Sequence, residues 1–481
     1  MYFCKVLNFT TYIFTMTYSP KVLEIIEKLN FFLLCESTKL NFRSNAQDFS
    51  RQSGKLGFSF YVLLCISLLK NSLAIELYNL LTINDLSPIS KSAYSQGRYK
   101  IQAKFYQVWN NLLVNLVYQA SSVERSVWLD LKKWRGYFLE AIDGTSLVLP
   151  QTKELGNYFG LHKSGTKKKT VTTCMAKCLL RVDLLNDYVL QSEVFKTTAS
   201  EINTCKTWLW QLNCNSINIF DRGFGNAAIF AYLVQNNKPF VCRLKVSFNK
   251  VVKDFMAGNL TDTEVYFTIG KTETFVNQAL STENDTDLET KLIPDTLIKK
   301  GTTVLVRLVK VVLPSGEIEV LATNLMDKAV ITVADLADLY RQRWGVETVI
   351  DSLKNQLLMM VFSGLKPEAI LQEIYASMFV YNFRNLLINQ AQELVNEQVK
   401  ESTRPIKYEQ KVNKNVALGV LKTRIITLFL VEDPEQIIKE LVLFFAKNKI
   451  PVVPNKPMPK RQKSLAKKRN LVVQNNYRKA I

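Results

Sequence analysis

The sequence predicts an α/β protein in which helical regions flank a central region rich in strands. Two observations support this prediction. Apolar residues recur at helical spacing from residue 21 to about residue 122, whereas short apolar runs typical of strands begin near residue 137. The chain also has 481 residues, of which 47% are apolar, so it can bury a large core in roughly two or three domains.

The chain carries a net charge of +20, from 62 Lys and Arg residues against 42 Asp and Glu residues. This excess indicates a polyanionic partner, either nucleic acid or an acidic membrane surface, although a generally basic solvated surface is the alternative. The apolar run Phe58–Leu69 has only 12 residues, too few to span a membrane. The hydrophobic stretch Met1–Pro20 lacks a positively charged start and a clean cleavage site, so we expect a cytoplasmic protein.

Eight cysteines occur without a CxxC pair, which in a chain of this length is typical of reduced, intracellular thiols. Cys174 and Cys178 could be metal ligands, but only one histidine, His162, could join them. Ordinary buried thiols are therefore the preferred interpretation. A single histidine also argues against His-based catalysis and zinc hydrolysis, so any chemistry in this chain is expected to use carboxylates.

The first 122 residues are predicted to form a helical DNA-binding domain, with helices over Val22–Leu29, Phe58–Asn79 and Phe105–Leu116. The segment Ser87–Lys100 begins with Ser and Pro, which favour a helix start. Preceded by the turn Thr82–Asp85, it resembles a helix-turn-helix, with an ordinary surface helix as the alternative. Three cations give this helix a basic side that we expect to face DNA: Lys91, Arg98 and Lys100.

The central region predicts three strands, a helix and a fourth strand, which is the order of an RNase H-like core. The second and third strands are expected at Thr170–Val182 and Tyr188–Val194, and the helix at Ser200–Leu212. The first strand, Phe138–Ile142, leads into Asp143, with the apolar run Ser146–Leu149 beyond it, and the fourth, Ile217–Phe220, ends at Asp221. If these two strands are neighbours in the sheet, the two aspartates converge at one edge.

Residues 246–330 interrupt this pattern and are predicted to form an inserted β subdomain. Val265–Ile269 and Thr303–Leu325 are strand-like, Leu313–Glu317 is typical of a hairpin turn, and the polar stretch Thr272–Thr290 is expected to be a mobile loop. Thr332 and Asp335 then form the pattern of a capping box at the start of a helix.

That helix carries a regular series of functional side chains. Tyr340, Arg343, Glu347 and Lys354 are spaced +3, +4 and +7, so helical periodicity places them within an arc of roughly 60°. One face of the helix therefore presents a carboxylate beside two cations and a phenol. Such a surface suits a metal ion and a phosphate held side by side.

Phosphodiester chemistry needs an activated nucleophile and a stabilised leaving oxygen, and two divalent ions can supply both. Asp143, Asp221 and Glu347 provide the few hard oxygen ligands that Mg²⁺ requires. Each motif alone has a simpler interpretation: a turn for Asp-Gly-Thr, a strand end for Asp-Arg-Gly-Phe and an i,i+4 ion pair for Arg343 with Glu347. Their combination favours a DNA-cutting enzyme, with phosphate contacts expected from Tyr340, Arg343, Lys354 and Arg222.

These motifs resemble those of the bacterial insertion-sequence DDE transposases of the IS-four-like group, to which the Tn-five type belongs. Asp143-Gly-Thr and Asp221-Arg-Gly-Phe match the two catalytic aspartates of that group, and the helix series matches its Y-(2)-R-(3)-E-(6)-K signature around the catalytic glutamate. The resemblance continues in Phe240–Lys245 and Ala322–Leu325. Three N-terminal segments also resemble this group of transposases, but less specifically: Phe49–Arg51, Lys55–Phe58 and Ser90–Lys100.

The resemblance implies a transposase that binds the terminal inverted repeats of its mobile element, cuts DNA there and joins the ends to target DNA. It also implies Mg²⁺ as the cofactor, with Mn²⁺ as a substitute, and a homodimer in a synaptic complex on double-stranded DNA. We expect no membrane contact and a cytoplasmic, nucleoid-associated location in a bacterium. Two alternatives are a domesticated or inactive DNA-binding protein on the same fold, and a metal-dependent DNA nuclease without strand transfer.

The resemblance further implies a hairpin intermediate at each DNA end. Some relatives stack a flipped base on a tryptophan of the insertion, but no tryptophan lies in residues 246–330 of this chain. Tyr266 or Phe267 would have to hold such a base here.

The predicted architecture is thus an α/β, RNase H-like catalytic core with an inserted β subdomain, preceded by a helical domain and followed by C-terminal helices. We expect helices over Pro367–Asn396 and Glu432–Ala446, and a basic disordered tail with nine Lys or Arg and no acid from Lys456. The predicted regions are a DNA-binding domain at 1–122, core at 123–245, insertion at 246–330, core helix at 331–365, C-terminal helices at 366–455 and tail at 456–481.

Overall fold

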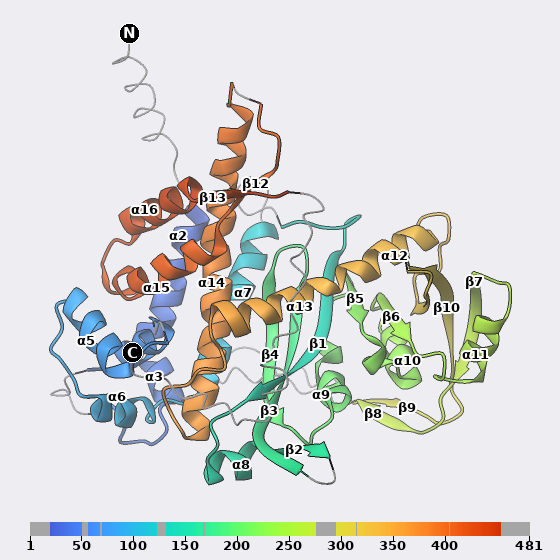
Figure 1. The fold of residues 1–481 in the computed structure, drawn as a ribbon, viewed down its shortest axis with the longest axis horizontal. Coiled ribbons are helices and arrows are strands. Elements are labelled where there is room, and N and C mark those ends of the chain that lie inside the picture. Colours follow the sequence, from blue (N-terminus) through green and yellow to red (C-terminus); the bar gives the residue numbers. More distant parts are fainter. Residues whose placement is uncertain are drawn as a thin grey trace. The chain divides into compact units, whose positions relative to one another are not determined.

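The computed structural model describes residues 20–50, 56–67, 70–122, 131–166, 169–275, 295–313, 315–403 and 405–453, in two compact units (Figure 1). The sheet unit comprises Lys132–Leu147 and Ala176–Ser352. The helical unit comprises the residues up to Leu131, Val148–Met175 and the residues from Leu353 onward. The predicted tail at 456–481 and most of the polar stretch Thr272–Thr290 lie outside the described residues.

The sheet unit is built on a mixed sheet whose central strands run in the order β4-β3-β1-β5-β6. β1 pairs parallel with β5, and β5 parallel with β6, whereas β3 and β4 are antiparallel. These strands are β1 (Phe138–Val148), β3 (Lys169–Asp183), β4 (Tyr188–Lys196), β5 (Ser216–Phe220) and β6 (Phe240–Leu244). The predicted strand and helix order is therefore confirmed, with β1 longer than expected because it continues through Asp143 and Gly144.

The predicted insertion does not form a separate β subdomain, because its main strands extend the same sheet. β6 pairs antiparallel with β11 (Ile318–Thr323), which pairs with β10 (Thr303–Val312), which pairs with β7 (Asp262–Thr268). The expected hairpin turn joins β10 to β11, where Leu313 and Glu317 are hydrogen-bonded. The region also contains elements that the sequence analysis did not anticipate: α11 (Lys250–Ala257) and a small sheet of β8 (Glu273–Phe275) and β9 (Thr296–Ile298).

Helices cover both faces of this sheet, so its strands are apolar on both sides. Alternate strand residues point to different cores because the side-chain period of a strand is two. Phe220 and Cys242 lie in one core with α9 (Glu201–Trp208) and α10 (Ala227–Gln235), whereas Ile219 and Val241 lie in another with α12 (Val333–Gln342).

The helical unit is organised around α14 (Pro367–Lys400), whose side chains are buried over most of its first 29 residues. A helix whose residues are buried on every side must be surrounded by other elements. Here it packs against helices from both ends of the chain, so residues 1–122 and 366–455 are not separate domains as we had predicted. The N-terminal members are α2 (Pro20–Leu34), α3 (Glu36–Phe42), α4 (Phe58–Ser67), α5 (Leu73–Ile83), α6 (Lys91–Arg98) and α7 (Lys104–Ser122).

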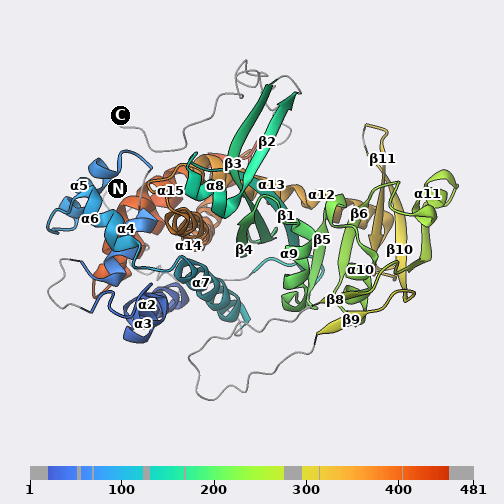
Figure 2. The same cartoon turned by 90° about the horizontal axis from the view of Figure 1, so that it is seen from below.

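The rest of the helical unit comes from the middle and the end of the chain. β2 (Leu161–Thr166) forms a hairpin with the first part of β3 (Figure 2), next to α8 (Lys153–Phe159). The predicted C-terminal helices correspond to α14 and α16 (Glu435–Lys447), with an additional helix, α15 (Lys414–Leu430), between them. The two-stranded sheet of β12 (Gln410–Val412) and β13 (Lys449–Pro451) completes the unit.

One predicted N-terminal helix is split in two. Phe58–Asn79 was expected to be continuous, but α4 ends at Ser67 and α5 begins at Leu73. Lys70, between them, has a φ of 71°, which a right-handed helix cannot contain. The pair α5–α6 nevertheless has the expected order, and the Ser90 side chain caps α6 by accepting a hydrogen bond from the Ala93 N–H.

The packing of α7 on α14 gives a stability prediction. The Trp109 indole is fully buried and stacks on the Phe379 ring at 3.8 Å between centroids. We expect Trp109→Ala to lower the free energy of unfolding by roughly 3–5 kcal/mol, because it leaves a large cavity between the N-terminal and C-terminal helices. Urea unfolding followed by circular dichroism measures this change.

A matched control is Trp344→Ala, because the Trp344 side chain is 61% exposed. We expect this variant to change the free energy of unfolding by less than about 1 kcal/mol. Equal effects of the two substitutions would contradict the packing of α7 on α14.

Candidate active site

Asp143 and Asp221 lie side by side at one end of the parallel β1–β5 pair. The last registered pair of these strands is Ile142 with Phe220; Asp143 is the next residue of β1, and Asp221 directly follows the end of β5. Asp221 is the residue before a 3-10 turn, Arg222–Phe224. The predicted convergence of the two aspartates is confirmed, and it follows from the strand register alone.

The helices α12 and α13 (Trp344–Asp351) bring the third carboxylate to the same place. Thr332 and Asp335 form the predicted capping box that starts α12. Arg343 separates the two helices but keeps right-handed helical dihedral angles, so the helical spacing of Tyr340, Arg343 and Glu347 is preserved. This local regularity is why their side chains share one face.

Contacts join this helix face to both aspartates. The Tyr340 hydroxyl donates to Asp221 Oδ1 at 3.3 Å, and Arg343 Nη1 lies 3.4 Å from Asp143 Oδ2. Arg343 Nη2 donates to Glu347 Oε1 at 2.8 Å. The structure thus brings together five of the predicted site residues in a single cluster.

Arg343 is the central cation of this cluster. It is paired with Glu347, which is the alternative that the sequence left open, and it also contacts Asp143. Its side chain is only 8% exposed, and its Nε–H is buried without a hydrogen-bond partner. A buried donor without an acceptor is costly, so a further acceptor at this point would stabilise the site.

Burial changes the acidity of two groups in the cluster. It raises the pKa of Asp143 to about 6, although the hydrogen bond from Gly144 N–H and the charge of Arg343 act in the opposite direction. Burial and the neighbouring Asp221 carboxylate raise the pKa of Tyr340, so its hydroxyl remains a neutral donor at physiological pH. Asp143 therefore ionises at a pH well above that of an ordinary aspartate.

Arg222 and Lys354 are the two remaining residues that the sequence predicts as phosphate ligands. Arg222 is exposed in the turn directly after Asp221. Lys354 lies in the π-helical turn Ser352–Gln356, on the other side of the unit boundary at Ser352, so the sheet unit does not contain it. The roles of both residues in binding DNA remain predictions.

The sheet register and an ion pair identify two residues for which the sequence predicted no role: Arg243 and Glu319. Phe220 pairs with Cys242 between β5 and β6, so Arg243 is the neighbour of Asp221 across the sheet. Arg243 Nη1 lies 2.7 Å from Glu319 Oε1 on β11, and Nη2 lies 3.3 Å from Glu317 Oε1. Burial raises the pKa of Glu319. Arg243 lies in the stretch Phe240–Lys245 that the resemblance includes, but the sequence gave no signal for its pairing with Glu319, because β6 and β11 are far apart along the chain.

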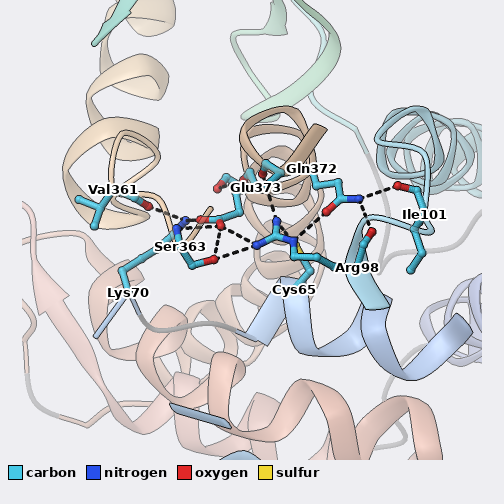
Figure 3. Close-up of polar contacts among 10 residues, drawn as sticks. Cys65, Lys70, Arg98, Ile101, Val361, Ser363, Gln372 and Glu373 are labelled. Carbon is cyan, nitrogen blue, oxygen red and sulfur yellow. Dashed lines mark hydrogen bonds and ion pairs between the residues drawn. The ribbon is translucent and has the colours of Figure 1, made fainter. Parts of the chain in front are cut away.

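The N-terminal cations divide into two kinds. Lys91 in α6 and Lys100 just beyond it are exposed, as contacts with DNA require. Arg98 is only 2% exposed and donates to Ser363 and Glu373, so the prediction that it faces DNA is wrong (Figure 3). The buried carboxylate of Glu373 provides a better partner for this guanidinium than solvent does.

The described residues contain no ready-made metal cluster: no group of three His, Cys, Asp or Glu side chains is arranged to hold a metal ion. Cys174 and Cys178 are buried thiols, in agreement with the interpretation from the sequence. Nor is any helix in the described ranges long and apolar enough to cross a membrane.

Residues 139–383, about half of the chain, match the family model described as "Transposase DDE domain", and the protein belongs to this family. The matched residues include all three acids of the cluster. No curated protein matches the sequence. Among solved structures, the chain is similar to the piggyBac transposase in a cryo-EM structure of its synaptic complex with hairpin DNA, at 11% sequence identity and a TM-score of 0.39. That similarity covers 92% of this chain and 89% of the other.

The acidity of Asp143 gives a prediction about stability and pH. Its pKa is about 6 in the folded protein and near 3.8 in an unfolded chain. The folded state thus holds the proton more tightly, and this contribution is complete below about pH 3.8 and is lost as the pH rises through 6. We expect Asp143→Asn, which cannot ionise, to be more stable than the wild type above pH 6 by on the order of 2–3 kcal/mol.

Urea unfolding of both proteins in a chelating buffer from pH 4 to pH 8 measures this difference. The two stability curves should converge at the acid end and separate as the pH rises. Parallel curves would show that Asp143 is not desolvated in the folded state.

Proposed function

We propose that the protein is a DNA transposase that binds the terminal inverted repeats of its mobile element, cleaves the DNA there and joins the 3′ ends to target DNA. The observation that supports this best is the juxtaposition of Asp143 and Asp221 on parallel neighbouring strands, beneath a helix that presents Tyr340, Arg343 and Glu347. Membership of the transposase DDE domain family supports the same activity.

The core is proposed to be RNase H-like, in the form found in bacterial IS-four-like transposases. The strand order β4-β3-β1-β5-β6 supports this, with three strands before the helix α9 and two parallel strands after it. The acids also lie where such a core would place them, on its first strand and at the end of its fourth.

The donor set of the site fits a divalent metal. Asp143, Asp221 and Glu347 offer hard oxygen ligands, as Mg²⁺ prefers, and Mn²⁺ would accept the same ligands. Bound at these carboxylates, the metal would activate the attacking water or 3′ hydroxyl and stabilise the departing oxygen. Glu347 is 41% exposed, so it can leave Arg343 and turn toward the aspartates without disturbing the core.

Arg343 is then proposed to bind a DNA phosphate. Release of Glu347 leaves Nη2 without its partner, and Nε already lacks one. A phosphate can accept both hydrogen bonds in the fork geometry that guanidinium groups favour. Tyr340 would hold Asp221 in place or donate to a phosphate oxygen, and Arg222 and Lys354 would add positive charge along the DNA.

The end-binding role is proposed for the α5–α6 pair, with Lys91 and Lys100 at DNA phosphates. Two copies of the chain would form the synaptic complex, each holding one DNA end. For a hairpin intermediate, Tyr266 is the suitable aromatic residue, because its side chain is 63% exposed on β7 whereas Phe267 is buried in the core.

Two other functions would use the same fold: DNA binding without turnover, and cleavage without strand transfer. The contacts of all three acids with Arg343 or Tyr340 argue against a decayed site. Inverted repeats that flank the gene and end at its boundaries would distinguish a transposase from a nuclease.

The three acids give the first functional prediction. We expect Asp143→Asn, Asp221→Asn and Glu347→Gln each to reduce cleavage of DNA ends by about 10²–10³-fold or more, while binding to these ends persists. Each substitution removes a metal ligand without changing the shape of the side chain. Gel assays of binding and of cleavage on the DNA that flanks the gene separate the two activities.

Asp338→Asn provides the matched control, because Asp338 is an exposed carboxylate on α12 that pairs with Arg341 rather than with the site. It should cleave like the wild type. Cleavage by Glu347→Gln at the wild-type rate would refute the proposed role of the acids.

Arg343 gives the second functional prediction. Arg343→Lys keeps the charge but loses the planar fork, so we expect cleavage to fall by at least about tenfold with little change in DNA affinity. Arg341→Lys is the control, because Arg341 is 75% exposed on the same helix. If Arg343→Lys cleaved as well as Arg341→Lys, the arginine would serve only as a counter-ion of Glu347.

A further inference from the structure

The solvent-facing side of α6 carries two polar residues, Ser92 and Gln96. Four residues apart, they lie about 40° from each other around the helix. Gln96 Nε2 donates to Ser92 Oγ at 3.3 Å, and both side chains are exposed. Three buried residues occupy the opposite side of the helix: Tyr94, Gly97 and Arg98.

Close packing fixes the buried side of α6 against α4. The Tyr94 ring is fully buried and stacks on the Tyr61 ring at 6.1 Å between centroids. A Cβ atom at Gly97 would lie 2.1 Å from Cζ of Tyr61, so only glycine allows the two helices to come this close. The helix therefore has little freedom to rotate or slide on α4.

Directional hydrogen bonds fix the end of α6 on α14. Arg98 donates from Nε to Gln372 Oε1 at 2.9 Å, and from Nη2 to the carbonyl of Ala369 at 3.0 Å. In return, Gln372 Nε2 donates to the carbonyls of Arg98, the last residue of α6, and of Ile101, three residues beyond it (Figure 3). The two residues thus bind each other in both directions.

The same network includes two more charged residues. Glu373 Oε1 accepts from Arg98 Nη1 at 2.9 Å, and Glu373 Oε2 accepts from Lys70 Nζ at 2.7 Å (Figure 3). The side chains of Lys70, Arg98 and Glu373 are each at most 5% exposed. Burying three charges costs so much desolvation that such a network contributes little net stability, but it can impose a single geometry.

We propose that α6 is the base-reading helix of the protein, that Ser92 and Gln96 read base edges in the major groove of duplex DNA, and that Arg98 is the residue that positions this helix. This inference rests on the proposed end-binding function. A glutamine side chain can make a bidentate pair with adenine, and a serine hydroxyl can donate or accept. Both residues lie on the outer side of a helix whose first turn, like that of other recognition helices, is exposed.

The charge around α6 suits this partner. No acid occurs in the sequence between Asp85 and Glu124, whereas Lys91, Lys100 and Lys104 are exposed. These lysines can contact phosphates on either side of a groove, which positions the helix without reading sequence. Sequence discrimination then depends on the side chains between them.

The first experiment compares Gln96→Ala with Gln436→Ala in the full-length protein. Gln436 is an exposed glutamine on α16 that, like Gln96, bonds a side chain four residues away. Each variant and the wild type select from a DNA pool in which the element end is randomised, at one fixed salt concentration. Gln96→Ala should lose on the order of tenfold discrimination at one adenine-containing base pair, and Gln436→Ala should lose none.

The second experiment tests the positioning role with Arg98→Met. This change leaves the Lys70–Glu373 ion pair electrically balanced, so the protein should fold. We expect the ratio of affinities for the element end and for scrambled DNA to fall by about tenfold or more, with the affinity for scrambled DNA retained. Leu441→Ala, which should be destabilised by a cavity at α16, a helix that contributes no residue to the network, should keep the wild-type ratio.

Different results would refute the end-binding function and the base-reading role of α6. A wild-type protein that does not prefer element ends would refute the end-binding function itself. If the wild type prefers them and Gln96→Ala keeps the full base preference, α6 does not read bases through this residue. If Arg98→Met and Leu441→Ala lower the ratio equally, Arg98 acts through general stability and not by positioning the helix.

Discussion

The parallel pairing of β1 with β5 is the constraint on which the candidate site depends. Asp143 and Asp221 are neighbours only because Ile142 and Phe220 are in register. A shift of one residue would turn every side chain of one strand to the opposite face. Burial on both faces of the sheet prevents such a shift, since Phe220 packs against α9 and α10 while Ile219 packs toward α12. The geometry of the acids is therefore set by apolar packing and not by the acids themselves.

This arrangement brings carboxylates together at an energetic cost, and Arg343 offsets part of that cost. It contacts Asp143 and Glu347, while Tyr340 donates to Asp221. The remaining cost is visible in the raised pKa of Asp143. A site of this kind is less stable than an apolar alternative, and the proposed cation at the carboxylates and phosphate at the arginine would offset that cost.

Local and periodic features were predictable from the sequence, whereas long-range packing was not. The capping box of Thr332 and Asp335 spans one helical turn. The spacing of Tyr340, Arg343 and Glu347 follows the helical period. Both patterns can therefore be recognised in the sequence. The pairing of β6 with β11 joins residues about eighty positions apart, and it turned an expected subdomain into part of the sheet. Likewise, Arg98 was expected at the surface because its partner Glu373 lies 275 residues away.

Arg98 and Arg343 look alike in the sequence, but their hydrogen bonds differ. Each forms an ion pair with a glutamate and is largely buried. Arg98 uses Nε and both terminal nitrogens on partners from α14 and nearby segments, so an additional ligand would have to displace an existing contact. Arg343 has an unpaired Nε–H, a long contact to Asp143 and one strong bond to a partly exposed carboxylate. The contacts of Arg98 hold the end of α6 in place, whereas Arg343 keeps one buried donor that the proposed phosphate would satisfy.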